Sequence, residues 1–132
     1  MSMDGSELSL SFAVRSSVES AKHYLTERTI LFVEMLGGTT EIKGDYPGWA
    51  YEPDSELREK FISVYEKMYG KAPVVEIIHA GLECGLLAKK IEGLDCISFG
   101  PNMHNVHTSE ETLEVESVQR MWQFLCAVLA EK

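Results

Sequence analysis

The sequence lacks the apolar run of roughly 20 residues that a membrane-spanning helix needs, and it is poor in basic residues. Lysine and arginine together number 12 against 21 aspartate and glutamate residues, so the formal net charge is −9. Nucleic acids and anionic membranes are bound through basic faces, and we therefore expect neither as a partner. Glycine and proline, at 10 and 4 of 132 residues, are too few for a collagen-like or disordered chain. The length fits one ordinary globular domain.

Cysteine is also scarce, with only Cys84, Cys96 and Cys126 in the chain. Their number is odd, their spacing is wide, and no C-x-x-C pair is present. This pattern does not suit the disulfide framework of a small secreted domain and is typical of a reduced compartment. We therefore expect a cytoplasmic protein.

Residues 1–44 predict a strand–helix–strand unit. Leu8–Val14 alternates apolar and small residues with the period of a half-buried strand. Ser16 and Glu19 have the spacing of a capping box that begins a helix, and Gly37 suits its end. Thr39–Lys43 is short and β-prone, and a helical crossover predicts that the two strands run parallel. One face of the helix carries an apolar stripe: Val18, Ala21, Leu25, Phe32 and Leu36.

A connector that is rich in aromatic residues and contains two prolines spans residues 44–54. Beyond it, the sequence pattern predicts the order helix, strand, helix, strand, helix. Ser55 is placed to cap the first helix and Gly70 to end it. Val74–Ile78 and Asp95–Phe99 have the length and composition of buried strands, with a short helix between them. We expect these strands to be parallel. The last helix has one apolar stripe that we expect in the core: Val115, Val118, Trp122, Leu125 and Leu129.

Polar side chains follow both of these strands. His79, Glu83 and Cys84 come after the first, and His104 and His107 come after the second. Ligands of parallel α/β sheets bind beyond the carboxyl ends of the strands, so a site is expected at this edge.

Each candidate also has a structural interpretation. The Glu83 carboxylate could bind an ammonium group or a metal, or it could simply stabilise a helix N-terminus through the helix dipole. The histidines could be metal ligands or solvated loop residues. Cys84 could act as a reactive or metal-binding thiolate, or it could fill space as a small apolar side chain. Arg15 suits a clamp on a substrate carboxylate or a surface residue paired with an acid.

Three strings carry a resemblance to a known family. Residues 75–85 read V-E-I-I-H-A-G-L-E-C-G, residues 97–101 read I-S-F-G-P, and residues 106–111 read V-H-T-S-E-E. Together they resemble the C-terminal part of aminoacyl-histidine (Xaa-His) dipeptidases, which are members of the di-zinc aminopeptidase and carboxypeptidase superfamily. The resemblance covers residues 8–131, and the H-A-G-L-E-C-G string is its most specific part.

The resemblance implies an α/β enzyme of two parts. Residues 1–44 correspond to the C-terminal half of a lid or dimerisation domain, with its strand–helix–strand portion. Residues 45–132 correspond to the C-terminal segment of a three-layer α/β/α catalytic domain with parallel strands. His107 falls on a zinc-ligand position, Glu83 on the position that holds the free amino group of the dipeptide, and Arg15 on the position that meets the substrate carboxylate.

The family's remaining zinc ligands and its general base, a glutamate, have no counterpart in this sequence. We therefore expect a fragment of a zinc-dependent dipeptidase that hydrolyses Xaa-His dipeptides, inactive alone and with no catalytic residue of its own. Its parent would hold two zinc ions, and this chain would bind zinc weakly at most. Exposed sheet edges and apolar faces would favour a homo-oligomer. The alternatives are a general dipeptidase or acylase parent, and a non-catalytic α/β ligand-binding or assembly module.

Overall fold

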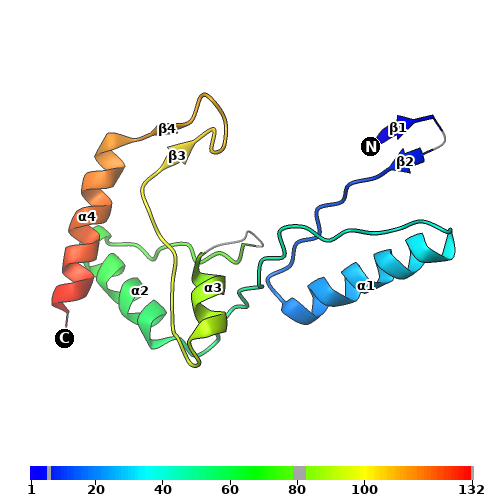
Figure 1. The fold of residues 1–132 in the computed structure, drawn as a ribbon. Helices are drawn as coiled ribbons and strands as arrows, with labels where there is room; N and C mark the ends of the chain where they lie inside the picture. The colour runs from blue at the N-terminus through cyan, green and yellow to red at the C-terminus, as the bar shows by residue number, and fades with distance from the viewer. Residues whose placement is uncertain (6, 79–82, 132) are drawn as a thin grey trace. The chain divides into compact units, whose positions relative to one another are not determined.

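The computed structural model describes residues 1–5, 7–78 and 83–131, and the chain forms two compact units. The first unit is Met1–Tyr51 with Ile77–Lys90, and the second is Glu52–Glu76 with Ile91–Lys132. Four helices and two short antiparallel hairpins among the described residues confirm mixed α/β content. In chain order (Figure 1) the elements are β1 (Ser2–Asp4), β2 (Glu7–Ser9), α1 (Glu19–Met35), α2 (Glu56–Tyr69), α3 (Glu83–Lys90), β3 (Met103–His104), β4 (Thr112–Leu113) and α4 (Val115–Ala130).

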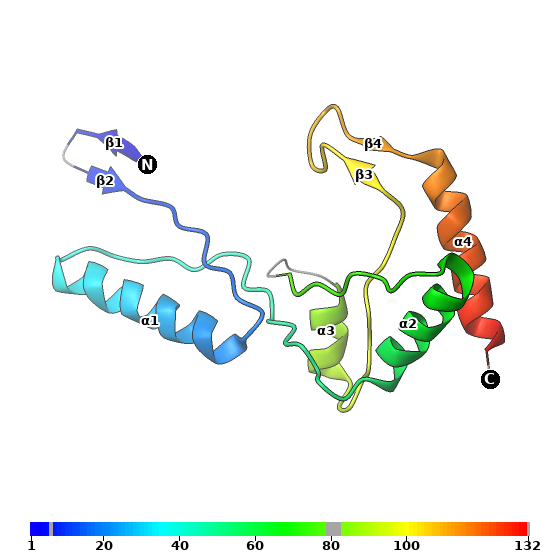
Figure 2. The ribbon, with the colours of Figure 1, turned by 180° about the vertical axis from the view of Figure 1, so that it is seen from behind.

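Helices α2 and α4 of the second unit lie side by side (Figures 1 and 2). As predicted, the Ser55 hydroxyl caps α2 by accepting the Arg58 N–H at 3.0 Å, and Gly70 ends the helix with φ 69°. The core between the helices consists of Val64, Phe124 and Val128. Phe124 also meets three aromatic rings edge-on at centroid distances of 5.4–5.8 Å: Phe61, Tyr65 and Phe99.

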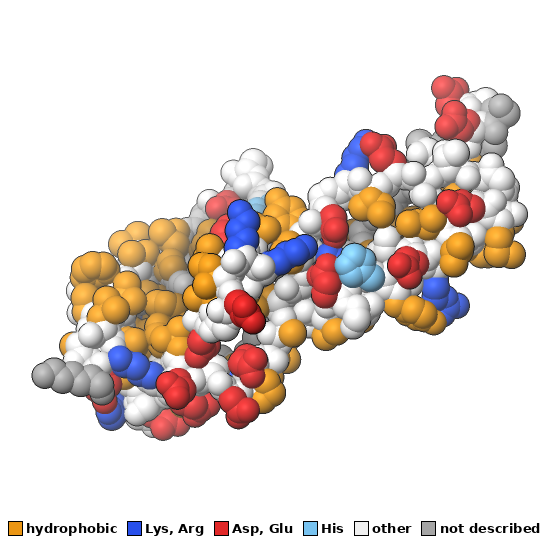
Figure 3. Space-filling view, turned by 60° about the horizontal axis from the view of Figure 1, so that its bottom comes forward, with side chains coloured by type: hydrophobic (Ala, Val, Ile, Leu, Met, Phe, Trp, Pro, Cys, Tyr) orange, Lys and Arg blue, Asp and Glu red, His pale blue; other side chains and the backbone are white. Residues whose placement is uncertain are grey.

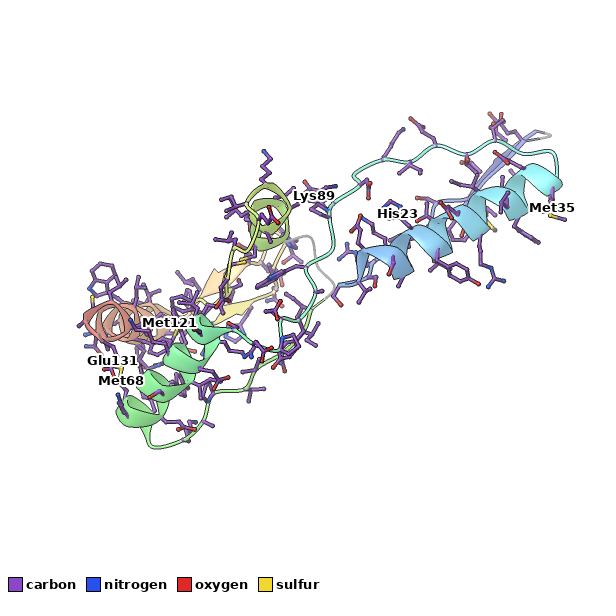
Figure 4. All side chains as sticks on the ribbon, turned by 90° about the horizontal axis from the view of Figure 1, so that it is seen from below. His23, Met35, Met68, Lys89, Met121 and Glu131 are labelled. Atoms are coloured by element: carbon purple, nitrogen blue, oxygen red, sulfur yellow. The ribbon has the colours of Figure 1, made fainter. Side chains whose placement is uncertain are left out.

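The apolar stripe predicted for the core on α4 is wrong. Trp122 is 65% exposed and Leu129 is 74% exposed, whereas Ser117, Phe124 and Val128 are buried. The helix is apolar on more than one face, and the aromatic cluster around Phe124 selects the face that packs on α2. Figure 3 shows hydrophobic side chains gathered on the surface of this unit. In Figure 4, Glu131 lies at the end of α4 beside Met68 of α2, where Lys67 and Glu131 form an ion pair.

Helix α1 of the first unit begins at Glu19, with Val18 as the N-cap residue. The predicted capping box is wrong, because the Ser16 hydroxyl accepts the N–H of Val18 and the Glu19 carboxylate accepts the N–H of Gly48. Gly37, with φ 77°, follows the helix end as predicted. The apolar stripe of α1 is not buried by other described residues: the side chain of Leu25 is 51% exposed and that of Phe32 is 64% exposed.

The predicted strands are largely replaced by other structure. Of the predicted strand Leu8–Val14, only Leu8 and Ser9 lie in a strand, β2, which pairs antiparallel with β1. The structure assigns no strand to three described segments that were predicted as strands: Thr39–Lys43, Val74–Ile78 and Asp95–Phe99. The parallel sheet and the three-layer arrangement are therefore not confirmed.

None of the described helices combines the length and the apolar character that crossing a membrane requires.

Candidate functional site

Glu83 is the first residue of α3 in the first unit, and its side chain is exposed. Lys89 and Lys90 lie in the last turn, so the charges at both ends suit the helix dipole. This position agrees with the structural interpretation of Glu83, and a carboxylate there is also free to face solvent. His79 lies outside the described residues.

The start of α3 is placed by two close backbone approaches within the first unit. A Cβ at Gly85 would lie 3.1 Å from the Pro47 carbonyl oxygen and 3.5 Å from the Trp49 Cβ. A Cβ at Gly48 would lie 2.6 Å from the carbonyl oxygen of Ser17. The segment that contains Pro47, Gly48 and Trp49 therefore lies between the start of α1 and the start of α3. A side chain at Gly48 would collide with the backbone, and one at Gly85 would make a tight contact that the Pro47 backbone must yield to.

A buried lysine holds the same segment in place, and no sequence pattern predicted it. Lys22 is 8% exposed. Its Nζ lies 2.7 Å from Asp45 Oδ1 and 3.1 Å from Glu19 Oε1, and it donates to the Tyr46 carbonyl oxygen. The other Glu19 oxygen accepts the Gly48 N–H at 2.6 Å. We call these residues the Lys22 clamp.

The clamp shifts the pKa of each charged member. The Gly48 N–H and then Lys22 lower the pKa of Glu19, and Lys22 lowers the pKa of Asp45. Burial of Lys22 opposes its charge, but the hydrogen bonds to Asp45 and Glu19 outweigh that effect and raise its pKa. His23, labelled on α1 in Figure 4, adds a ring nitrogen 3.1 Å from Glu19 Oε1.

Arg15 lies in the first unit, between β2 and α1, and its side chain is exposed. Among the residues that the structure describes, no acid pairs with it, so the predicted surface ion pair is not found. The guanidinium remains accessible to a ligand carboxylate.

His107 belongs to the second unit and lies in a loop whose ends form the β3–β4 hairpin. In this hairpin, Met103 pairs with Leu113 and His104 pairs with Thr112. His107 is exposed and has φ 67°, the left-handed region that few non-glycine residues adopt.

The donor set tests the predicted metal role of His107. Zinc sites need about four nitrogen, sulfur or oxygen ligands. Within residues 1–5, 7–78 and 83–131, no group of three or more His, Cys, Asp or Glu side chains is placed to hold an ion. These residues therefore do not form a zinc site by themselves, and His104 and His107 do not make one as a pair. Cys84, Cys96 and Cys126 all lie in the described part of the chain, and none of them forms a disulfide.

An apolar hollow of about 230 Å³ lies on the outer side of α4 in the second unit. Its lining contains no titratable side chain among the described residues. The lining residues are Phe99, Gly100, Pro101, Val118, Met121, Trp122 and Leu125.

Comparison with known proteins gives two close similarities, and no protein-family model matches the chain. The cytosol non-specific dipeptidase of Escherichia coli is 33% identical over 131 residues, which is 99% of this chain and 27% of the relative. The crystal structure of aminoacylhistidine dipeptidase from Vibrio alginolyticus superposes with a TM-score of 0.72 at 35% identity, covering 86% of this chain and 23% of that one. This chain is homologous to these dipeptidases and spans about a quarter of their length.

Proposed function

We propose that this chain, which is homologous to two bacterial dipeptidases, is part of a zinc-dependent dipeptidase that hydrolyses Xaa-His dipeptides. The observation that carries the proposal is the 33% identity with the E. coli enzyme over 99% of the chain. The TM-score of 0.72 with the Vibrio enzyme agrees with it at the level of the backbone. The chain spans 27% and 23% of these proteins, so the remaining catalytic groups would come from other parts of a longer protein.

Residues 1–44 would form part of the lid and residues 45–132 part of the catalytic domain. Val74–Ile78 and Asp95–Phe99 would gain strand neighbours there and join a parallel sheet within a three-layer domain. The reason is that both segments have the composition of buried strands, and neither belongs to the two hairpins that the described residues form. By itself the 132-residue chain would be inactive.

Three exposed side chains would contribute to the site. Glu83 would hold the free ammonium group of the dipeptide through its carboxylate, and Arg15 would bind the substrate carboxylate through its planar guanidinium. His107 would be one zinc ligand. Zinc supplies such enzymes with an activated water, and the share of this chain is limited to holding the ion and the two ends of the substrate.

The two similar proteins carry different specificities in their names, "non-specific" and "aminoacylhistidine". A broader dipeptidase is therefore the second candidate function. A panel of dipeptides that differ only in the second residue separates the two, because the proposal expects the highest kcat/KM with histidine there. Equal kcat/KM values across the panel would favour the broader enzyme.

The role of Glu83 is tested in the longer protein with Glu83→Gln. Loss of the charge should raise KM for a free dipeptide by about tenfold to a hundredfold, whereas an N-acetylated dipeptide should be an equally poor substrate for both proteins. Glu92→Gln, an exposed glutamate beyond the end of α3, is the matched control and should change neither value. An unchanged KM for Glu83→Gln would remove the assigned role.

The isolated chain tests the fragment proposal. The purified 132-residue protein should not release amino acids from an Xaa-His dipeptide when zinc is added, and light scattering should show a homo-oligomer because apolar residues of α1 and α4 are exposed. Zinc-dependent hydrolysis by this chain would contradict the proposal. Binding of an amino acid that survives Glu83→Gln and Arg15→Ala would favour a non-catalytic ligand-binding module.

A further inference from the structure

We propose that Glu111 is a positioning residue for His107. This inference rests on the proposed function, because it concerns how the imidazole is presented. Glu111 Oε2 accepts the backbone N–H of His107 at 2.7 Å. Glu111 thus acts through His107 and need not touch a substrate or a metal.

The base of this hairpin is firmly held. The Glu114 N–H donates to the Asn102 carbonyl oxygen at 3.0 Å, which closes the two strand ends. Ser117, only 2% exposed, accepts the Asn102 N–H at 2.8 Å and donates its hydroxyl to the Glu114 carbonyl oxygen at 2.6 Å. Both ends of the loop are therefore tied to the first turn of α4.

The tip of the hairpin has an unusual backbone. Asn105 has φ 51° and His107 has φ 67°, and these are the two non-glycine residues with positive φ in the described chain. The Thr108 N–H and hydroxyl both donate to the Asn105 carbonyl oxygen, at 3.1 and 2.7 Å, and the N–H bond closes a β-turn with Val106 and His107 at its centre. A positive φ at the third residue of a β-turn is typical of the type II form, so the turn favours the positive φ of His107. It does not involve the N–H of His107.

Glu111 provides the contact that the turn does not. It lies directly before β4, on the side of the loop that the hairpin base holds, and its carboxylate reaches back four residues to His107. A histidine in the left-handed region is disfavoured unless its surroundings fix it, and such residues cluster at functional sites. The turn alone leaves this backbone strained for histidine, and the bond to Glu111 supports it. Without that bond, we expect ordinary φ values at His107 to be populated more often and the imidazole to move.

The first test is made on the 132-residue chain by NMR. In Glu111→Ala, the HN–Hα coupling and the ¹³Cα shift of His107 should show a loss of the left-handed conformer by about threefold to tenfold. Glu111→Gln keeps an amide oxygen that accepts the same N–H and should restore it. Glu110→Ala removes an adjacent acid and should have no effect. Unchanged α4 signals in each variant verify the fold, and unchanged His107 signals in Glu111→Ala would overturn the proposal.

The second test measures zinc affinity of the longer protein. Glu111→Ala should weaken zinc binding by about tenfold to a hundredfold, as loss of an outer contact to a ligand does, and Glu111→Gln should recover most of it. Unchanged affinity in Glu111→Ala beside a weakened His107→Ala would overturn the positioning role. If His107→Ala itself keeps full affinity, the metal assignment under the proposed function fails, while the NMR result still decides whether Glu111 fixes the backbone.

Discussion

Each of the two units of this chain is stabilised internally by a different kind of contact. In the second unit, Val64, Phe124 and Val128 are buried within a cluster of aromatic rings. In the first unit, the buried residues among those described are Lys22 and Gly85, and no large apolar side chain is buried. One unit thus has a small apolar core, while the other depends on charged hydrogen bonds and on close backbone contacts at glycines.

This difference identifies the apolar surfaces of each unit that another part of a protein could bury. The second unit buries one face of α4 and leaves Trp122 exposed, and the first leaves the apolar stripe of α1 exposed. Apolar patches of this kind mark interfaces in soluble proteins. They agree with the proposal that the chain is completed by further protein, either the rest of a longer chain or a second copy.

The largest effect is expected where the apolar core is removed. Phe124→Ala should destabilise the second unit by about 3–5 kcal/mol, because a buried aromatic leaves a cavity. Trp122→Ala on the exposed face of the same helix should cost less than about 1 kcal/mol. Urea unfolding followed by circular dichroism measures both. If Trp122→Ala destabilised the unit more than Phe124→Ala, the face of α4 that the sequence pattern predicted would be the core after all.

A smaller loss is expected for the clamp of the first unit. Lys22→Met should destabilise that unit by about 1–2 kcal/mol, because Asp45, Glu19 and the Tyr46 carbonyl oxygen lose a shared donor. Hydrogen exchange at the Gly48 N–H measures the local effect. Lys43→Met removes an ion pair with Glu41 whose side chains are 77% and 72% exposed, and it should change nothing measurable. Equal effects of Lys22→Met and Lys43→Met would show that the Lys22 clamp does not stabilise the first unit.

A gain of stability is expected at the hairpin tip. Glycine adopts φ 67° without the steric cost that histidine has, so His107→Gly should stabilise the second unit by about 0.5–1 kcal/mol. His104→Gly in β3 should instead destabilise it by a similar amount, since glycine weakens a strand. Thermal unfolding of both variants gives the comparison. A loss of stability in His107→Gly would show that the imidazole, rather than the backbone, stabilises the loop.

The smallest effect is expected from pH. The folded pKa values of Glu19 and Asp45 lie below their ordinary values of 4.5 and 3.8, so their stabilising contribution is full above those values and is lost as pH falls through the folded pKa values. Lys22 has a raised pKa, so its contribution is full below 10.5 and is lost at higher pH. Exchange at Gly48 should therefore rise relative to α4 amides below pH 4 and above pH 10.5. A ratio that stays constant over both ranges would contradict this.

The sequence predicted those features that depend on local residues. The Ser55 cap and the Gly70 end of α2 were predicted from residues within one turn of the helix. The short helix before Gly93 was also predicted, although α3 begins earlier, at Glu83. Local capping chemistry needs no knowledge of the tertiary structure.

Features that depend on distant partners were not predicted. The Ser16–Glu19 box failed because Gly48, which is far along the chain, binds the Glu19 carboxylate. The core face of α4 was misassigned because periodicity cannot show which face α2 selects. Glu83, Arg15 and His107 were singled out by their places in the predicted elements, and a resemblance gave them roles that remain predictions. The Glu111 contact to a backbone N–H has no sequence signature.

The central claim is that His107 is a zinc ligand of a dipeptidase to which this chain contributes. The most direct measurement compares zinc content and Xaa-His hydrolysis of the longer protein with those of its His107→Ala and His104→Ala variants. The account predicts that His107→Ala loses zinc and at least roughly a hundredfold in kcat/KM, while His104→Ala keeps both. Full zinc content and full activity in His107→Ala would contradict it.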